Sequence, residues 1–257
     1  MGKFNLILIL IITRAMKLKE ILAPSLTDIQ RQKPSAPLVT VSADSESCQE
    51  ILAKGWLTEA QMRHAAECYQ LGKSRSGKTI FWMIDEQGHV RDGRIGTSWV
   101  SQMLKAREPL LLRDWHACHC LFGMQLKTRE AQESVLLGRA QGGGKAPIAV
   151  VERELTAVVM SELLPDYTWM AAMYPANLTP ESLMPLRNRS VTLFPHTDSS
   201  MDNYMAFLEL ADLLRRECQM EITVSSVLED NATPEQKERC IDVLDFILVP
   251  HGDADLS

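Results

Sequence analysis

The sequence predicts an α/β protein with a mainly parallel sheet, preceded by a small β-rich (α+β) region. After residue 146, runs of β-forming residues alternate with segments of helical periodicity, which is typical of a parallel sheet. Residues 147–151 read Pro-Ile-Ala-Val-Val, a continuous apolar run that indicates a strand buried on both faces. Residues 79–95 carry a hairpin signal and define the smaller region.

The elements of the second half alternate regularly. Thr179 suits a helix cap and Pro180 the first helical turn. Strands are expected at residues 147–151, 169–173, 190–194 and 221–227. Helices are expected at residues 153–164, 179–186, 201–218 and 234–248. This order places helices on both faces of the sheet.

The smaller region combines helices and strands. Thr58 and Gln61 have the spacing of a capping box, which predicts a helix over residues 58–69. Residues 79–84 are rich in β-formers, and a polar turn ending in Gly88 leads to a second strand at 89–95, so we expect a hairpin. A helix at 99–104, a strand at 118–123 and a helix at 128–138 complete this region.

Composition shifts suggest where the domains begin and end. Proline and serine clusters before residue 56 resist regular structure, and three consecutive glycines at 142–144 form a flexible connector. The expected division is an N-terminal extension and linker, partly disordered, at 1–56, the small region at 57–140, a Gly-rich linker at 141–147, the α/β domain at 148–250 and a tail at 251–257.

The N-terminus begins with an apolar run at residues 4–12 that is similar to the start of a signal peptide. Basic residues follow at once, no small-x-small cleavage site is evident, and the run is far shorter than the ~20 residues of a membrane span. We therefore expect no stable membrane span, and hypothesise that translation begins at Met16, with residues 1–15 an upstream extension. The six cysteines form no regular framework, which favours reduced thiols and a cytoplasmic location.

Charge is unevenly distributed along the chain. Residues 61–127 hold 10 basic and 6 acidic residues, whereas residues 148–257 hold 7 basic and 19 acidic ones. A basic middle before an acidic end is compatible with a nucleic-acid face beside a metal-binding face. The alternative is two solvated surfaces of opposite sign.

Residues 72–79 match the phosphate-loop pattern G-x-x-x-x-G-K-[ST]. That loop needs a strand before it and a helix after it, whereas here a helical segment precedes and a β-rich run follows. We expect a basic loop leading into the hairpin and no ATP-binding P-loop, with an ATPase as a third hypothesis that nucleotide binding lost on Lys78→Ala would support. Lys73, Arg75 and Lys78 would contact a nucleic-acid backbone.

His116, Cys118, His119 and Cys120 resemble half of a zinc site. Structural zinc needs a second ligand pair, which the sequence lacks. We therefore expect no zinc, and a buried strand with incidental thiols.

Two carboxylates follow predicted strands. Glu152 comes directly after the first strand of the second half, and Asp198 comes shortly after the third. Ligand crevices of α/β sheets lie outside the carboxyl ends of strands, and Mg²⁺ prefers oxygen ligands. The two positions are candidates for a Mg²⁺ site, although single acidic residues at such places are common in proteins without one.

Three segments of the second half carry a family resemblance. Residues 150–157 (VVERELTA) resemble the Glu motif of toprim domains, residues 194–198 (FPHTD) resemble their Asp-x-Asp motif, and residues 240–245 (CIDVLD) are similar to an acidic tail of primase-like members. The resemblance implies a toprim-like three-layer domain. Residues 70–248 as a whole resemble bacterial primase-like proteins often associated with mobile elements, through residues 77–82, 88–93 and 120–123.

The chain departs from that family in two ways. His196 stands where the first Asp of Asp-x-Asp is expected, and a neutral imidazole is a poor Mg²⁺ ligand. The Cys-rich zinc module that begins longer members is missing, so the chain looks like an N-terminally shortened member. Both departures bear on whether a Mg²⁺ site is still functional.

The resemblance implies a toprim-containing, primase-like protein that binds or acts on DNA or RNA. In an active form, Glu152 would be the general acid or base and a metal ligand, and Asp198 with Asp202 would hold Mg²⁺ for phosphoryl transfer. Arg91 and Arg94 would join the basic loop in positioning the nucleic acid. The alternative is a non-catalytic binding remnant with a degenerate metal site. The sequence does not indicate which oligomeric state the protein adopts.

Overall fold

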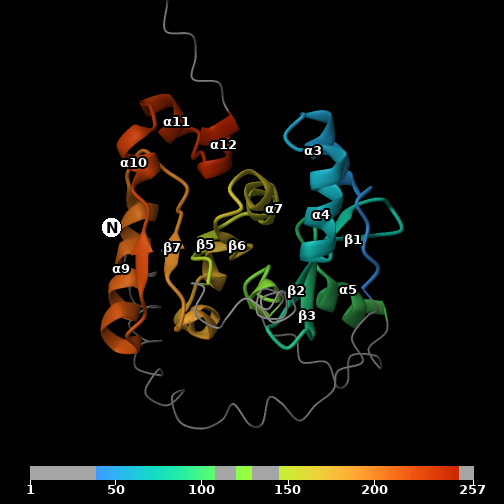
Figure 1. Ribbon diagram of the computed structural model, residues 1–257, viewed down its shortest axis with the longest axis horizontal. Helices are drawn as coiled ribbons and strands as arrows, with labels where there is room; N and C mark the ends of the chain where they lie inside the picture. The colour runs from blue at the N-terminus through green and yellow to red at the C-terminus, as the bar shows by residue number, and fades with distance from the viewer. Residues whose placement is uncertain (1–38, 108–119, 129–144, 249–257) are drawn as a thin grey trace, which may run out of the picture.

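The computed structural model describes residues 39–107, 120–128 and 145–248. Within these ranges the strands form two four-stranded sheets, one in the order β1-β2-β3-β4 and the other in the order β6-β5-β7-β8 (Figure 1). The first is antiparallel and the second is parallel. The predicted α/β class, with a parallel sheet preceded by a small β-rich region, is confirmed.

The parallel sheet forms from four short strands joined through helices. Its strands are β5 (Ile148–Val151), β6 (Thr168–Ala171), β7 (Val191–Leu193) and β8 (Ile222–Val224). The connections contain α7 (Glu154–Leu163), α8 (Pro180–Leu183) and α9 (Asp202–Cys218). The sequence runs β5, β6, β7, but β5 lies between the other two. A central strand with both faces covered explains the continuous apolar run.

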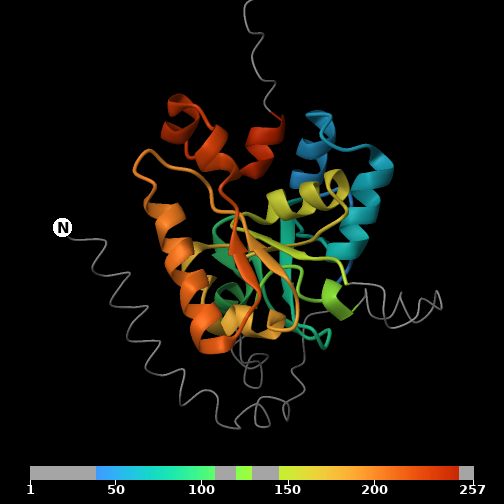
Figure 2. The ribbon, with the colours of Figure 1, turned by 60° about the vertical axis from the view of Figure 1, so that its left-hand side comes forward.

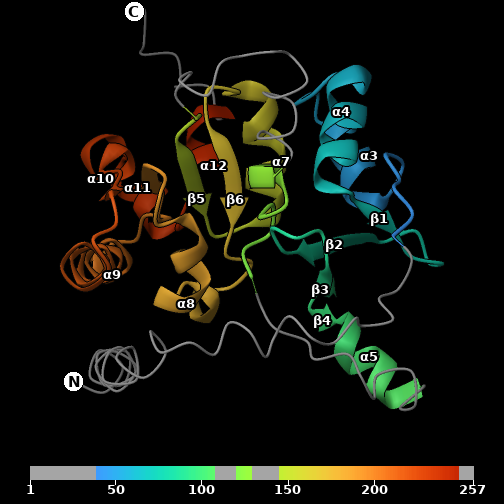
Figure 3. The same cartoon turned by 60° about the horizontal axis from the view of Figure 1, so that its bottom comes forward.

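Alternate residues of β5 face different helices. Ala149 and Val151 belong to the core cluster that includes α7, whereas Ile148 and Val150 belong to the cluster that includes α9. Figure 3 shows α7 and α9 on opposite sides of β5 and β6. The domain therefore has three layers, as the alternation of strands and helices predicts.

The predicted hairpin is confirmed as β2 (Thr79–Ile84) and β3 (Val90–Ile95), which pair antiparallel. The sheet is completed by β1 (Gly72–Lys73) and β4 (Ser98–Trp99), and α5 (Val100–Arg107) follows. The indole of Trp82 packs so closely against Gly72 and Gly93 that neither position has room for a side chain. A Cβ on Gly72 would lie 2.6 Å from the indole, and a Cβ on Gly93 would lie 2.7 Å from it.

Within residues 1–56, which the sequence assigns to a partly disordered extension and linker, residues 46–53 are helical. They form α3 (Glu46–Ala53), which buries Cys48 and Ile51. The predicted helix α4 (Glu59–Tyr69) begins with the expected capping box of Thr58 and Gln61. Figure 2 shows α3 and α4 beside α7. Proline and serine clusters upstream hid a helix whose stability comes from packing rather than from its own propensity.

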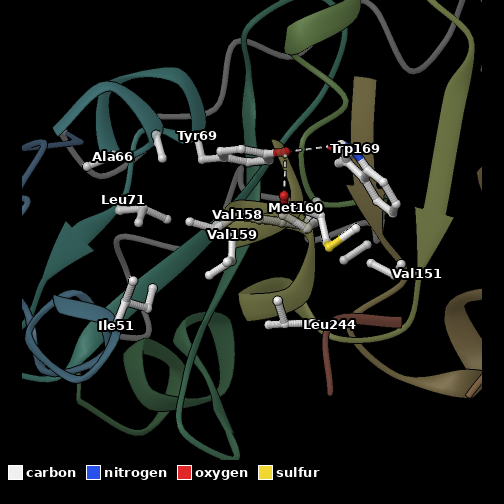
Figure 4. Packing of buried hydrophobic residues seen from close by; sticks show 14 of the residues in the cluster. Ile51, Ala66, Tyr69, Leu71, Val151, Val158, Val159, Met160, Trp169 and Leu244 are labelled. Carbon is white, nitrogen blue, oxygen red and sulfur yellow. Dashed lines mark hydrogen bonds between the residues drawn. The ribbon is translucent and has the colours of Figure 1, made fainter. Parts of the chain in front are cut away.

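One hydrophobic core joins the two regions. It contains Ile51, Ala66 and Tyr69 from the first region together with Val158 and Trp169 from the second (Figure 4). Most of the predicted Gly-rich linker at 141–147 lies outside the described residues. The two regions that it was expected to separate share their interior and pack as one body.

The remaining predictions differ in detail. The expected strand at 118–123 is reduced, within the described residues, to a single bridge between Phe122 and Ala171. The expected helix at 234–248 is split into α11 (Pro234–Glu238) and α12 (Val243–Leu248), with Cys240 between them at a φ of 51°. The structure adds α10 (Val227–Asn231) and two 3₁₀ helices, Pro175–Asn177 and Met184–Leu186.

Several sequence predictions fall outside the described residues. They are the apolar run at 4–12, the start at Met16, the helix beyond residue 128 and the tail after residue 248. Among the helices that the structure describes, none combines the length and apolar character needed to cross a membrane.

Candidate functional site

Glu152 and His196 meet at the carboxyl edge of the parallel sheet. Glu152 directly follows β5, and His196 lies three residues after β7, the strand that pairs with β5. A pocket of about 250 Å³ opens at this point. Its lining residues are Glu152, Arg153, His196, Cys240 and Asp242. The crevice thus lies where parallel α/β sheets usually bind ligands.

The carboxylate of Glu152 is held by two side chains. Its Oε1 accepts hydrogen bonds from Nδ1 of His196 at 2.7 Å and from Nδ2 of Asn203 at 2.9 Å. The backbone N–H of His196 approaches the same oxygen at 3.3 Å. Among the described residues, no hydrogen bond reaches Oε2. Glu152 therefore keeps one oxygen for a ligand and uses the other to fix the loop after β7.

Each partner shifts the pKa of the other in the direction that favours its charged form. Burial favours a higher pKa for Glu152, but the hydrogen bond and charge of His196 outweigh it and the pKa lies below the ordinary value. The hydrogen bond to Glu152 raises the pKa of His196 above its ordinary value, against the effect of burial. The electrostatics therefore widen the pH range over which the two side chains form an imidazolium–carboxylate pair.

Asp198 accepts hydrogen bonds from backbone N–H groups at the start of α9. Its Oδ1 accepts from the backbone N–H of Ser200 at 2.8 Å, and its Oδ2 accepts from the backbone N–H of Asn203 at 2.9 Å. Burial alone raises its pKa, but these and neighbouring hydrogen bonds lower the pKa overall. Asp202 is exposed in the first turn of α9. The carboxylate of Asp198 stabilises the start of that helix.

Asn203 is a site residue that sequence reasoning missed. Besides Glu152, its amide nitrogen donates to the backbone carbonyl of His196 at 2.9 Å. It therefore links β5, the loop after β7 and the first turn of α9. The one hint in the sequence was that Asn203 lies only five residues after the predicted site residue Asp198. An asparagine in a predicted helix does not by itself indicate a functional site.

Arg153 and the C-terminal acidic segment form the other wall of the pocket. The Nε of Arg153 donates to Oδ2 of Asp242 at 2.7 Å, and its NH2 nitrogen lies 2.6 Å from Oδ2 of Asp245. Thr156 also donates to Asp242. Burial opposes the charge of Arg153, but the two carboxylates raise its pKa. The acidic tail seen in the sequence thus binds the residue next to Glu152.

The predicted metal ligands do not form a ready site. Among the described residues, no group of three or more histidine, cysteine, aspartate or glutamate side chains is placed to hold a metal ion. Both oxygens of Asp198 accept hydrogen bonds from the backbone, and His196 presents an N–H to Glu152. This donor set does not fit a resident Mg²⁺, which prefers several oxygen ligands.

The phosphate-loop pattern lies in a tight turn between antiparallel strands. The backbone N–H of Ser74 donates to the carbonyl of Lys78 at 2.9 Å, where β1 leads into β2. No helix begins at this turn. Lys73, Arg75 and Lys78 are exposed, and Lys73 lies 2.7 Å from Asp44. The expected basic loop is present, in a geometry unlike that of a P-loop.

Arg91 and Arg94 point into the protein. Arg91 lies 2.5 Å from Asp85. Arg94 pairs with Glu154 and donates to the backbone carbonyl of Met173 at 2.7 Å. Both guanidinium groups thus have partners within the protein, and their expected role in positioning a nucleic acid stays a prediction.

The buried partner of Arg94 is Glu154. Burial raises its pKa, while the charge of Arg94 opposes that rise. Oε1 of Glu154 and Nε of Arg94 are buried without a hydrogen-bond partner among the described residues. The pair connects β3 to the first turn of α7, two residues from Glu152.

The zinc-like cluster cannot be placed as a whole, because His116, Cys118 and His119 lie outside the described residues. Cys120 is half-buried and packs against both large core clusters.

A family model described as Domain of unknown function (DUF6371) matches residues 49–197, more than half of the chain. The chain belongs to this family. The DUF6371 match begins within α3 and ends just after His196, so it includes both regions of the shared core and both members of the Glu152–His196 pair.

Comparison with curated proteins gives no match. Among solved structures, the DUF6371 chain is similar to the primase fragment of the bacteriophage T7 primase-helicase protein. The TM-score is 0.42 at 14% sequence identity, over 78% of this chain and 76% of that chain. A likeness of this size assigns no activity to the DUF6371 chain.

Proposed function

We propose that this protein is a toprim-like, primase-like nucleic-acid-binding protein whose metal site is degenerate. The observation that carries the proposal is the Glu152–His196 pair in the pocket at the carboxyl edge of the sheet. The motif resemblance of residues 150–157 and 194–198 points to nucleic acid as the ligand. The partner is DNA or RNA.

The charges in the pocket favour binding without a resident metal. With His196 protonated, the two positive groups, Arg153 and His196, balance the two negative groups, Glu152 and Asp242. The residues that line the pocket then carry no net charge, whereas Asp245 beside Arg153 and Asp198 near His196 add negative charge around it. A site with a second aspartate in place of His196 would need a cation to offset the repulsion.

The exposed turn between β1 and β2 supplies a second contact surface. Arg75 and Lys78 are exposed, and neither forms an ion pair with another described residue. Free cations of this kind bind phosphates and release counterions, which gives affinity without sequence preference.

Fluorescence anisotropy with labelled single-stranded DNA and RNA oligonucleotides tests the binding. Arg75→Gln combined with Lys78→Gln should weaken binding and reduce the salt dependence by up to about two charges. Arg216→Gln, at an exposed residue near the end of α9, makes the same change of charge per residue; it is the control and should leave affinity nearly unchanged. Binding that is absent in the wild type, or equal in the double variant, would contradict the proposal.

Mg²⁺-dependent phosphoryl transfer is the second candidate. It is favoured by the ionised Glu152, whose Oε2 faces no hydrogen-bond donor among the described residues. Calorimetric titration with Mg²⁺ separates the candidates. A degenerate site predicts weak or no binding by the wild type and a gain on His196→Asp that Glu152→Gln removes. Tight wild-type binding, lost on Glu152→Gln, would favour the catalytic candidate.

A further inference from the structure

A cysteine, a histidine and a glutamate form a hydrogen-bonded chain on the surface shared by α4 and α7. The Nδ1 of His64 lies 2.7 Å from Oε1 of Glu162, and the Nε2 of His64 lies 3.4 Å from Sγ of Cys68. His64 and Cys68 are one helical turn apart on α4, so their side chains share a face. Glu162 reaches them from α7.

The arrangement determines which nitrogen of His64 carries the proton. A carboxylate only accepts hydrogen bonds, so Nδ1 donates to Glu162. In the neutral ring this leaves Nε2 as the acceptor, directed at the thiol of Cys68. The imidazole is thus placed to take the thiol proton, while Glu162 stabilises the imidazolium that forms.

The three residues are separate from the pocket, and the group reaches the surface through His64. Glu162 lies near the C-terminal end of α7, whereas Glu152 precedes its N-terminus, and ten helical residues span about 15 Å. The side chain of His64 is 61% exposed, while that of Glu162 is 11% exposed. Cys68 is half-buried and is not in a disulfide. The sulfur of Cys68 therefore lies beside a largely exposed imidazole, and that imidazole is bonded on its other side to a mostly buried carboxylate.

Other cysteines provide a contrast within the same molecule. Cys48 is fully buried, and burial raises its pKa, so its thiol is chemically protected. Cys240 is exposed, and its sulfur makes a weak hydrogen bond to the carbonyl of Glu238 at 3.9 Å. On exposure alone, Cys240 should react faster than Cys68. Activation by His64 reverses that order.

We propose that Cys68 is an activated thiol that forms a mixed disulfide with low-molecular-weight disulfides of the glutathione type. His64 accepts the proton of the Cys68 thiol, and the thiolate attacks one sulfur of the small disulfide. The new bond joins Cys68 to that sulfur as the old S–S bond breaks. The second half leaves as a thiolate and takes the proton from His64, so the small disulfide is the oxidant.

The test compares two cysteines in one reaction. The full-length protein is incubated with glutathione disulfide at pH 7 and pH 9, quenched with acid, digested with trypsin and analysed by mass spectrometry. Trypsin places Cys68 in the peptide 64–73 and Cys240 in the peptide 240–257, so each thiol is followed separately. We expect Cys68 to react about tenfold faster than Cys240 at pH 7, and to keep more of its pH 9 rate.

Substitutions assign the effect to the hydrogen-bonded chain. His64→Asn should lower the rate of Cys68 about tenfold at pH 7, because no base remains beside the thiol, and Glu162→Gln should lower it by a smaller factor. The rate of Cys240 should stay the same in both variants, and Cys48 should stay unmodified, which shows that the fold is intact. A Cys68 rate no higher than that of Cys240, or unchanged by His64→Asn, overturns the proposal.

Discussion

The hydroxyl group of Tyr69 donates a hydrogen bond to the backbone carbonyl oxygen of Trp169 at 2.8 Å, and lies 3.1 Å from the carbonyl oxygen of Ala157. Tyr69 ends α4, Trp169 lies in β6 and Ala157 in α7. The Tyr69 ring also stacks on Phe122, with 5.0 Å between ring centroids. One side chain from the first region is therefore anchored in the parallel-sheet region, as Figure 4 shows.

Tyr69→Phe should lower the free energy of unfolding by about 1–2 kcal/mol, because buried carbonyl groups lose their hydrogen-bond donor while the ring packing is kept. Urea unfolding followed by far-UV circular dichroism measures the change. Tyr204→Phe is the control, since this half-buried tyrosine has no such hydrogen bond among the described residues, and it should change stability by less than about 0.5 kcal/mol. Equal effects of the two substitutions would contradict the anchoring role.

Helix α3 contributes to the same core, so its loss should affect the whole molecule. Ile51 is 1% exposed, and Ile51→Ala should lower the free energy of unfolding by about 2–5 kcal/mol. Leu164→Ala, at a residue 42% exposed, should cost much less. The decisive measurement is whether near-UV and far-UV signals shift together in urea. Separate transitions would show that α3 and the parallel sheet unfold independently.

The buried pair of Arg94 and Glu154 offers a double-mutant cycle. Arg94→Met leaves the carboxylate of Glu154 buried without its counter-charge, at a cost of about 3–5 kcal/mol. Adding Glu154→Leu should recover a large part of that loss, because no buried charge remains. Thermal or urea unfolding of the four proteins gives the coupling. Additive costs would mean that the two side chains do not interact.

The elements that follow strong local patterns were predictable from the sequence. The apolar run at β5, the Thr58 capping box and the polar turn of the hairpin all depend on neighbouring residues, and all three predictions are confirmed. Helix α3 was missed because its stability depends on packing against distant residues, which no local pattern records. The break at Cys240 had no glycine or proline to mark it.

The sequence indicated where on the sheet the candidate site lies, but not which side chains contact one another there. Strand ends indicated Glu152 and the loop of His196, because paired parallel strands end at one edge. The sequence could not show that Asp198 faces the start of α9, or that Asn203 reaches back to Glu152. The contact between Arg94 and Glu154 could not be predicted either, because a charged residue in a strand gives no sign of a buried partner sixty residues away.

The Glu152–His196 pair predicts a specific dependence of stability on pH. The folded pKa of His196 lies above its unfolded value of 6.5, so its contribution is complete below that value and is lost as pH rises through the folded pKa. The folded pKa of Glu152 lies below its unfolded value of 4.5, so its contribution is present above 4.5 and is lost as pH falls through the folded pKa. The pair should therefore stabilise the fold most between pH 4.5 and 6.5.

Urea unfolding of the wild type and of His196→Gln at pH 5.5 and pH 9 measures this dependence. The difference in the free energy of unfolding should be larger at pH 5.5 and should shrink toward pH 9, because the raised pKa of His196 makes the imidazolium contribution decline as pH rises. Glu152→Gln provides the matched background, because glutamine keeps the acceptor oxygen without the charge. In that background the effect of His196→Gln should vary much less with pH. A difference that grows toward pH 9, or that is equally pH-dependent in both backgrounds, would show that the carboxylate does not hold the imidazolium.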